Sequence, residues 1–238
     1  MSDARDWNEY ILEDLLVDIQ PGFARRPSSD AGSVPQLRTN NVSPEGRLDL
    51  SQLKYVPASK EEIEKYSLVK GDVLFNNTNS NIWVGKTAFV DRSLKPLYSN
   101  HLTRLRVDKT RIDPQFLAIY LHKLQREGFF KSIATRWVNQ TAVNTNALRN
   151  LTMKVPSLDY QKRIVAVLNY ADKLRQRREK VNQLTGKIIQ SVFLKMFGDP
   201  VENPMGWPIA TVGSVTDYHQ QGFYTKQEYG STGTPLLR

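Results

Sequence analysis

The chain has 238 residues and a net charge of +9 at pH 7, and its composition of 39% hydrophobic and 24% charged residues excludes collagen-like, low-complexity and wholly disordered proteins. Cysteine is absent, which excludes disulfides, thiolate metal sites and a cysteine nucleophile and fits a reducing compartment. No apolar run approaches the roughly 20 residues of a membrane span, and residues 1–7 are too polar for a signal peptide, so we expect a cytoplasmic protein.

The first part of the chain predicts short strands separated by turns. Gly71 and Asp72 lead into the apolar residues 73–75, which indicates a turn followed by a buried strand. Further strands are predicted at 83–90 and 101–107. A helix follows, because Asp113 is a good cap, proline stands at its first position, and apolar residues recur at helical spacing as far as residue 124.

After Pro156 the pattern predicts one long helix. From residue 158 to about 197 there is no proline and a single glycine, and 40 helical residues would make a rod of roughly 60 Å. Apolar residues recur in alternating steps of three and four, with Arg178 and Thr185 as polar interruptions, which is typical of a coiled-coil seam. The residues expected to meet a partner helix are Ile164, Val167, Ala171, Leu174, Val181 and Ile188, followed by Val192.

An internal repeat appears when the chain is aligned with itself at an offset of 200 residues. Residues 7–38 then match 207–238 at seven positions: Trp7 and Trp207, Gln20 and Gln220, Gly22 and Gly222, Phe23 and Phe223, Pro35 and Pro235, Leu37 and Leu237, and Arg38 and Arg238. The repeat predicts one unit of about 200 residues followed by the opening of a second copy.

Enzymatic motifs are missing from the sequence. No two glycines are spaced as in a dinucleotide-binding loop, and Gly85-Lys86-Thr87 lacks the leading glycine of a phosphate-binding loop, because Ser80 stands in its place. The three histidines, His101, His122 and His219, are scattered, so each is expected to be structural or on the surface. The chain is therefore predicted to hold no active site, metal or cofactor.

The positive charge and several polar clusters favour nucleic acid as a partner. Residues 21–150 carry twenty Lys and Arg against eleven Asp and Glu. The amide of Asn can pair with adenine, and Arg or Lys can read guanine, so these clusters favour DNA binding. The alternative interpretation is that Asn-rich loops are only turns. The candidate contacts, taken from clusters at 25–41, 76–86 and 136–146, are Arg25, Arg26, Asn77, Asn79, Lys86, Arg136 and Asn139.

Several segments together resemble the specificity subunit of type I restriction-modification systems. They are VKGDVLFNNTNS at 69–80, VGKTA at 84–88, SNHLTRLR at 99–106, residues 144–155, and PSLDYQ at 156–161 followed by Ile164. Tyr160 departs from the family pattern, which commonly has Glu there. A Glu would complete a capping box with Ser157, so the helix start is expected to be slightly weaker.

This resemblance implies an α+β chain without catalytic activity, in which a mixed α/β target-recognition domain precedes a long coiled-coil helix. Residues 1–156 would form that domain, 157–197 the spacer helix, and 198–238 the start of a second, truncated domain. In the family each domain reads one half of a split site in double-stranded DNA. The long helices pack antiparallel and dock adenine methyltransferase subunits, which carry S-adenosylmethionine, and some complexes of the family also include a motor-nuclease subunit.

Three further expectations stay open. The lone helix predicts a homodimer, because two copies would supply each other's missing partner helix. A free-standing dimeric DNA-binding regulator would bind DNA without any methyltransferase. A nuclease with an unrecognised site would cut DNA on its own when metal is present.

Overall fold

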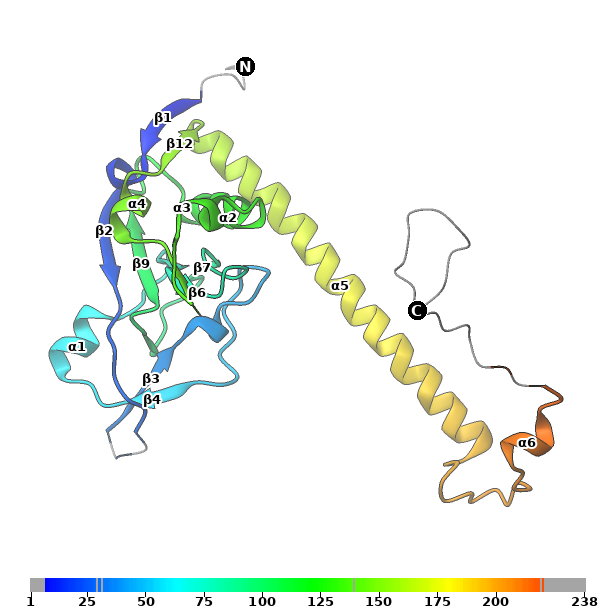
Figure 1. The fold of residues 1–238 in the computed structure, drawn as a ribbon. Helices are drawn as coiled ribbons and strands as arrows, with labels where there is room; N and C mark the ends of the chain where they lie inside the picture. The colour runs from blue at the N-terminus through cyan, green and yellow to red at the C-terminus, as the bar shows by residue number, and fades with distance from the viewer. Residues whose placement is uncertain (1–6, 29, 31, 139, 219, 221–238) are drawn as a thin grey trace, which may run out of the picture. The chain divides into compact units, whose positions relative to one another are not determined.

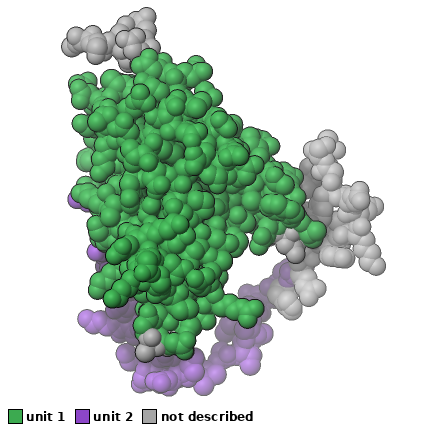
Figure 2. All heavy atoms as spheres, turned by 90° about the vertical axis from the view of Figure 1, so that its left-hand side faces the viewer, with its two compact units in different colours: residues 1–176 green, residues 177–238 purple. Residues whose placement is uncertain are grey.

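The computed structural model describes residues 7–28, 30, 32–138, 140–218 and 220. The chain divides into two compact units, residues 1–176 and 177–238, which Figure 2 colours separately. The boundary lies inside the long helix α5 (Leu158–Phe197), so the first turns of this helix belong to unit 1. The three-part division into 1–156, 157–197 and 198–238 stays a prediction.

A four-stranded antiparallel sheet forms the centre of unit 1, in the order β2-β9-β5-β7. Neighbouring residues of a strand point to opposite faces. Phe75 and Leu105 therefore pack in one hydrophobic cluster, while Leu74 and Leu102 pack in another. The strands are β2 (Leu16–Pro21), β5 (Val73–Asn76), β7 (Thr87–Phe89) and β9 (Leu102–Val107).

Helix α2 (Pro114–Arg126) packs on the larger cluster. The side chain of Asp113 caps it by accepting hydrogen bonds from the backbone N–H groups of Gln115 and Phe116, each at 2.9 Å. Figure 1 shows α2 and the short helix α3 (Phe129–Ile133) on the same side of β2 and β9. The helix expected from residue 114 onward is confirmed, and it runs two residues beyond the last predicted apolar position.

Smaller elements complete unit 1. Strand β3 pairs with β4 in the antiparallel and with β8 in the parallel direction, beside the second cluster. Ser59 and Glu62 form a capping box at the start of helix α1. The elements are η2 (Thr39–Asn41), α1 (Lys60–Lys65), β3 (Val34–Leu37), β4 (Lys54–Val56) and β8 (Leu97–Tyr98).

Two segments far apart in the sequence of unit 1 meet in a two-stranded sheet. Strand β1 (Asn8–Ile11) pairs antiparallel with β12 (Thr152–Val155), so that Asn8 lies opposite Val155. A single helical turn, η1 (Leu12–Leu15), follows β1 and inserts its two leucines into the larger cluster. This pairing closes unit 1 immediately before the long helix begins.

A second single helical turn stands 200 residues after η1. It is α6 (Val212–Val215), so the two segments take similar local conformations. Leu12 and Leu15 are fully buried, whereas Val212 and Val215 are 76% and 71% exposed. Five later matches of the repeat, Gly222, Phe223, Pro235, Leu237 and Arg238, lie outside the described residues, and so does His219.

The strand predicted over 83–90 forms only at its end. β7 covers Thr87–Phe89, and the residues before it turn, because the N–H groups of Trp83 and Val84 both bond to the carbonyl of Ser80 at 3.0 Å. Gly85 follows with φ +85°. A side chain at this position would strike the ring of Phe130, so the glycine ends the turn and lets the aromatic core close over it.

The long helix α5 begins at Leu158 and ends at Phe197, which confirms its prediction. Gln161 anchors its first turn and is fully buried. Its Oε1 accepts from the N–H of Asp113 at 2.8 Å, and its Nε2 donates to the carbonyls of Pro156 and Arg111 at 2.8 and 3.2 Å. One amide therefore ties the start of α5 to the start of α2.

Candidate nucleic-acid interface

A small sheet brings two of the predicted polar clusters together. Its order is β10-β11-β6, with strands of two residues each, and Arg136, Thr141 and Asn79 lie directly opposite one another. Directly opposed residues share a face of a sheet. Arg136 and Asn79 are thus neighbours across one intervening strand. The strands are β6 (Thr78–Asn79), β10 (Thr135–Arg136) and β11 (Thr141–Ala142).

Strands β10 and β11 form a hairpin with an apolar tip. The N–H of Trp137 donates to the carbonyl of Gln140 at 2.7 Å and closes the turn. Trp137 is 61% exposed and Val138 is 99% exposed, beside the exposed Arg136. Asn139, also a candidate contact, lies outside the described residues.

The two Asn candidates beside this hairpin differ in what their amides already do. The Nδ2 of Asn77 donates to Thr103 Oγ1 at 2.9 Å and to the carbonyl of Asn100 at 3.2 Å, so this amide holds the loop together. The Oδ1 of Asn79 accepts from the N–H of Ser80 at 2.8 Å. Its Nδ2 has no partner among the described residues, and Asn79 is the freer of the two.

Lys86 is buried, and its position argues against a contact with DNA. Only 7% of the residue is exposed, and its ammonium donates to the carbonyl of Thr39 at 3.0 Å and to that of Val42. Burial lowers the pKa of Lys86, while the nearby carboxylate of Glu45 acts in the opposite direction. The ammonium also lies 5.7 Å from the ring centre of Trp83. The sequence around Lys86 is typical of a binding loop, but in the structure its ammonium donates to backbone carbonyls inside unit 1.

Arg25 and Arg26 belong to the segment after β2 and are not part of the small sheet. Both are exposed, and Arg25 pairs with Glu62 of α1 at 2.6 Å. A chain of hydrogen bonds connects this segment to Asn77, since the N–H of Asn100 donates to the carbonyl of Phe23, and the carbonyl of Asn100 accepts from Asn77. The two arginines are therefore available on the surface, with Arg25 partly neutralised.

The two arginines of segment 99–106 are structural. Arg104 is buried and bonds Asp18 at 2.6 Å, and Arg106 holds Asp72 through two bonds of 2.7 and 3.0 Å. Their charges are balanced inside the fold. Burial raises the pKa of Tyr98, which faces Arg104, well above its ordinary value, so this phenol stays neutral.

The predicted seam of α5 is exposed along most of its length. Ile164 packs against the larger cluster, whereas Val167, Ala171 and Leu174 face solvent within unit 1. In unit 2 the same holds for Val181 and Ile188. An exposed apolar stripe of this kind requires a partner to become buried.

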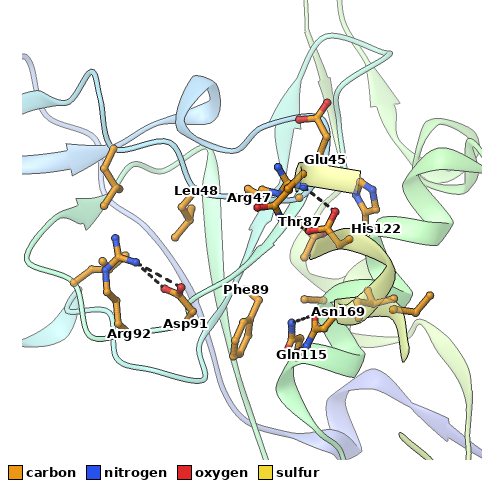
Figure 3. Close-up of a pocket in the computed structure, with 18 residues that line it drawn as sticks. Glu45, Arg47, Leu48, Thr87, Phe89, Asp91, Arg92, Gln115, His122 and Asn169 are labelled. Carbon is orange, nitrogen blue, oxygen red and sulfur yellow. Dashed lines mark hydrogen bonds and ion pairs between the residues drawn. The ribbon is translucent and has the colours of Figure 1, made fainter. Parts of the chain in front are cut away.

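A cavity of about 530 Å³ lies in unit 1 between residues 168–176 of α5, helix α2 and the segment after η2 (Figure 3). Arg47 reaches Asp172 of α5 at 2.7 Å, and the amides of Gln115 and Asn169 pair at 2.7 and 3.2 Å. Burial raises the pKa of Asp172, but hydrogen bonds from Gln176 and Arg47 outweigh it and lower the pKa. These contacts hold this part of α5 against α2 and the segment after η2.

Within the described residues, no group of three or more His, Cys, Asp or Glu side chains is placed to hold a metal ion. None of the helices in that part of the chain is long and apolar enough to cross a membrane. The fold and site together define a basic α+β recognition module with an exposed polar and aromatic hairpin, joined to a long helix.

Comparison with known proteins identifies the family. Residues 5–185 match the model of the type I restriction modification DNA specificity domain, so the chain belongs to this family. The resemblance noted from the sequence is thereby confirmed.

The individual relatives agree. The chain is 31% identical over 216 residues to a putative type I restriction enzyme MjaX specificity subunit of Methanocaldococcus jannaschii, covering 89% of this chain and 50% of that protein. It is 23% identical over 197 residues to the StySPI specificity subunit of Salmonella potsdam, covering 80% and 42%. A chain from a structure of the type I R-M system superposes with a TM-score of 0.58 at 19% identity, covering 81% and 45%, which supports the α+β fold. The chain thus spans about half the length of the relatives it matches.

Proposed function

We propose that the chain is a noncatalytic DNA-recognition subunit of a type I restriction-modification complex. It reads one half of a split site in double-stranded DNA and docks an adenine methyltransferase subunit through α5. The observation that carries this proposal is the three-stranded sheet that joins Arg136 and Asn79 beside an exposed hairpin, in a member of the DNA specificity family. S-adenosylmethionine would be held by the methyltransferase, and a motor-nuclease subunit would join the same complex.

The proposed contacts are the exposed Arg136, Arg25 and Arg26 and the half-buried Asn79. The amide of Asn77 instead bonds within the fold. Lys86 is left out because its ammonium is already satisfied by two carbonyls. Asn139 keeps its place in the set as a sequence-based prediction.

Docking through α5 is supported by its unpartnered apolar stripe. The seam could face a methyltransferase, the matching helix of a second recognition unit, or a second copy of the chain. All three require the exposed residues near Leu174 and Val181 to become buried. The contacts of Gln161 and Arg47 would hold the helix start at a fixed angle to the DNA-reading face.

The test is co-expression with the adenine methyltransferase subunit, followed by selection from a pool of random-sequence DNA duplexes. We expect the two proteins to co-purify and the complex to enrich one short sequence. Selection by the chain alone, without the methyltransferase, would instead support a free-standing regulator. Cleavage of the duplexes by the purified chain with Mg²⁺ would contradict a noncatalytic role.

The contact surface is tested separately by salt dependence. Arg136→Ala should flatten the slope of log affinity against log salt by about one, because one phosphate contact is lost. Lys86→Ala, measured on the protein that remains folded, should leave the slope of log affinity against log salt unchanged. An unaltered slope for Arg136→Ala would remove β10 from the interface.

A further inference from the structure

The tip of the β10–β11 hairpin carries apolar side chains that folding does not explain. Trp137 and Val138 are 61% and 99% exposed, and neither belongs to a hydrophobic cluster of the described residues. Trp137 flanks the turn and Val138 occupies one of its central positions. Central positions of hairpin turns favour Gly, Asn and Asp, so a valine there gives no conformational advantage.

The base of the same hairpin is held firmly. Strand β11 pairs with β10 on one side and with β6 on the other. Thr141 is buried, and the next residue but one, Val143, enters the larger cluster while its N–H donates to the carbonyl of Asn77 at 2.9 Å. An exposed aromatic side chain on a fixed support loses little freedom when it binds.

The surroundings of the tip favour a polyanion. Residues 128–158, which contain the hairpin, include no Asp or Glu and four basic residues. Lys131 and Arg136 are exposed, whereas Arg149 pairs with Glu13 and Lys154 lies opposite Glu9 in the β1–β12 sheet. Residues 73–90, which supply β6, also include no acidic residue. Both stretches that build this sheet therefore lack the negative charge that would repel phosphates.

We propose that the tip of the β10–β11 hairpin is a wedge that enters a groove of double-stranded DNA, where Trp137 stacks on a base at the recognised half-site. Arg136, next in the chain, would hold the adjacent phosphate. This inference rests on the proposed DNA-recognition function and specifies how one element carries it out. Apolar and aromatic wedges act by partly unstacking a base step, which the indole face then covers.

The proposal distinguishes two side chains that stand next to each other. Stacking on a base is nearly independent of salt, whereas a phosphate contact releases counterions and depends on it. Trp137→Ala should therefore weaken binding equally at every salt concentration. Arg136→Ala should change the slope.

The experiment uses the complex of the full chain with the methyltransferase subunit and the duplex that the wild-type complex enriches from a random pool. We expect Trp137→Ala to weaken binding about ten- to hundredfold at all salt concentrations, the range that stacking on one base gives. Trp137→Phe should retain most of the affinity. Trp207→Ala, which removes another exposed tryptophan from unit 2, is the matched control and should bind as the wild type does.

A second readout follows the base itself. 2-Aminopurine placed in turn at each position of the enriched duplex should change its emission at one step when the wild-type complex binds. Trp137→Ala should abolish this change and Trp137→Phe should retain it.

Three outcomes are decisive. Wild-type affinity and an unchanged 2-aminopurine signal for Trp137→Ala would overturn the wedge while leaving DNA recognition intact. Loss of methyltransferase co-purification in Trp137→Ala would also overturn it, by assigning the tip to a protein contact. If the wild-type complex enriches no sequence, the proposed function itself fails.

Discussion

Lys86 and Arg136 are both basic residues within polar, Asn-containing clusters, yet the fold gives them opposite environments. Lys86 donates to backbone carbonyls inside unit 1, while Arg136 stands on an exposed strand. The sequence alone does not distinguish the two, because it does not show which charged side chain is already hydrogen-bonded within the fold. The backbone of residues 39–42, more than forty residues away, decides the role of Lys86.

This difference predicts a difference in stability. Lys86→Ala should lower the free energy of unfolding by about 2–4 kcal/mol, because it removes packing and leaves buried carbonyls without a donor. Arg136→Ala should change it by less than about 0.5 kcal/mol, as is usual for an exposed site. Urea unfolding of both variants checks this, and equal losses would contradict the assignment of Lys86 to the interior.

His122 predicts how stability depends on pH. Burial lowers its pKa below the ordinary 6.5, and the positive charges of Arg126 and Arg175 lower the pKa further. The negative charge of Glu45 raises the pKa but does not cancel these effects. As pH falls through 6.5, the unfolded chain takes up the proton first, so the folded state loses stability.

Replacing His122 should therefore flatten this dependence. We expect His122→Gln to reduce the loss of stability between about pH 7 and pH 5, by at most about 1.4 kcal/mol per pH unit for one proton. Arg126→Gln should flatten it in part. Urea midpoints measured across this range decide the point, and a wild-type slope in both variants would show that His122 does not titrate differently on folding.

At the scale of elements, two glycines with different surroundings give opposite predictions. Gly85 has φ +85°, and a Cβ there would lie 2.4 Å from the ring of Phe130. Gly186 lies inside α5 with nothing within 4 Å of such a Cβ. Gly85→Ala should cost about 2–4 kcal/mol of stability through overlap and backbone strain.

Gly186→Ala should instead strengthen α5 locally by about 1 kcal/mol, since alanine has the higher helix propensity. Thermal unfolding reports the first change, and amide hydrogen exchange of residues near 186 reports the second. A loss of protection around Gly186→Ala would mean that this glycine is needed for a close approach.

The helices were predictable from the sequence because their signals are local. Asp113 with a following proline sets the start of α2, and the absence of proline after Pro156 allows α5 to run for 40 residues. The prediction of a strand at 83–90 was wrong over its first part, because two N–H groups there donate to the carbonyl of Ser80 and form a turn.

The site was less accessible to prediction because its sheet depends on long-range pairing. Strands β6, β10 and β11 have two residues each, too few for a period to be visible. Only the fold shows that the clusters around Asn79 and Arg136 meet. The exposure of Trp137 was equally invisible, although a Trp-Val pair in an otherwise polar stretch was an available signal.

At the scale of the whole molecule, the apolar seam of α5 is exposed and a partner helix would bury it. The turn at 212–215 matches the turn at 12–15, while the valines of the second turn are exposed where the leucines of the first are buried. A second copy of the chain would supply the helix that the seam requires.

The seam predicts self-association in the absence of other subunits. Sedimentation of the purified chain should show a concentration-dependent mass approaching two copies, and Leu174→Asp with Val181→Asp should reduce it to one. Gln183→Asp with Gln190→Asp places the same charges elsewhere on the helix and should leave the mass unchanged. A monomer at every concentration would remove the homodimer.

Sequence-specific DNA recognition is tested most directly by one ratio. The affinity of the chain–methyltransferase complex for its enriched duplex is compared with that for a scrambled duplex of the same composition, at one fixed salt concentration. We predict a ratio of about a thousandfold or more, as specific DNA-binding proteins give. A ratio near one would show that the basic surface holds DNA without reading it and would contradict the proposed function.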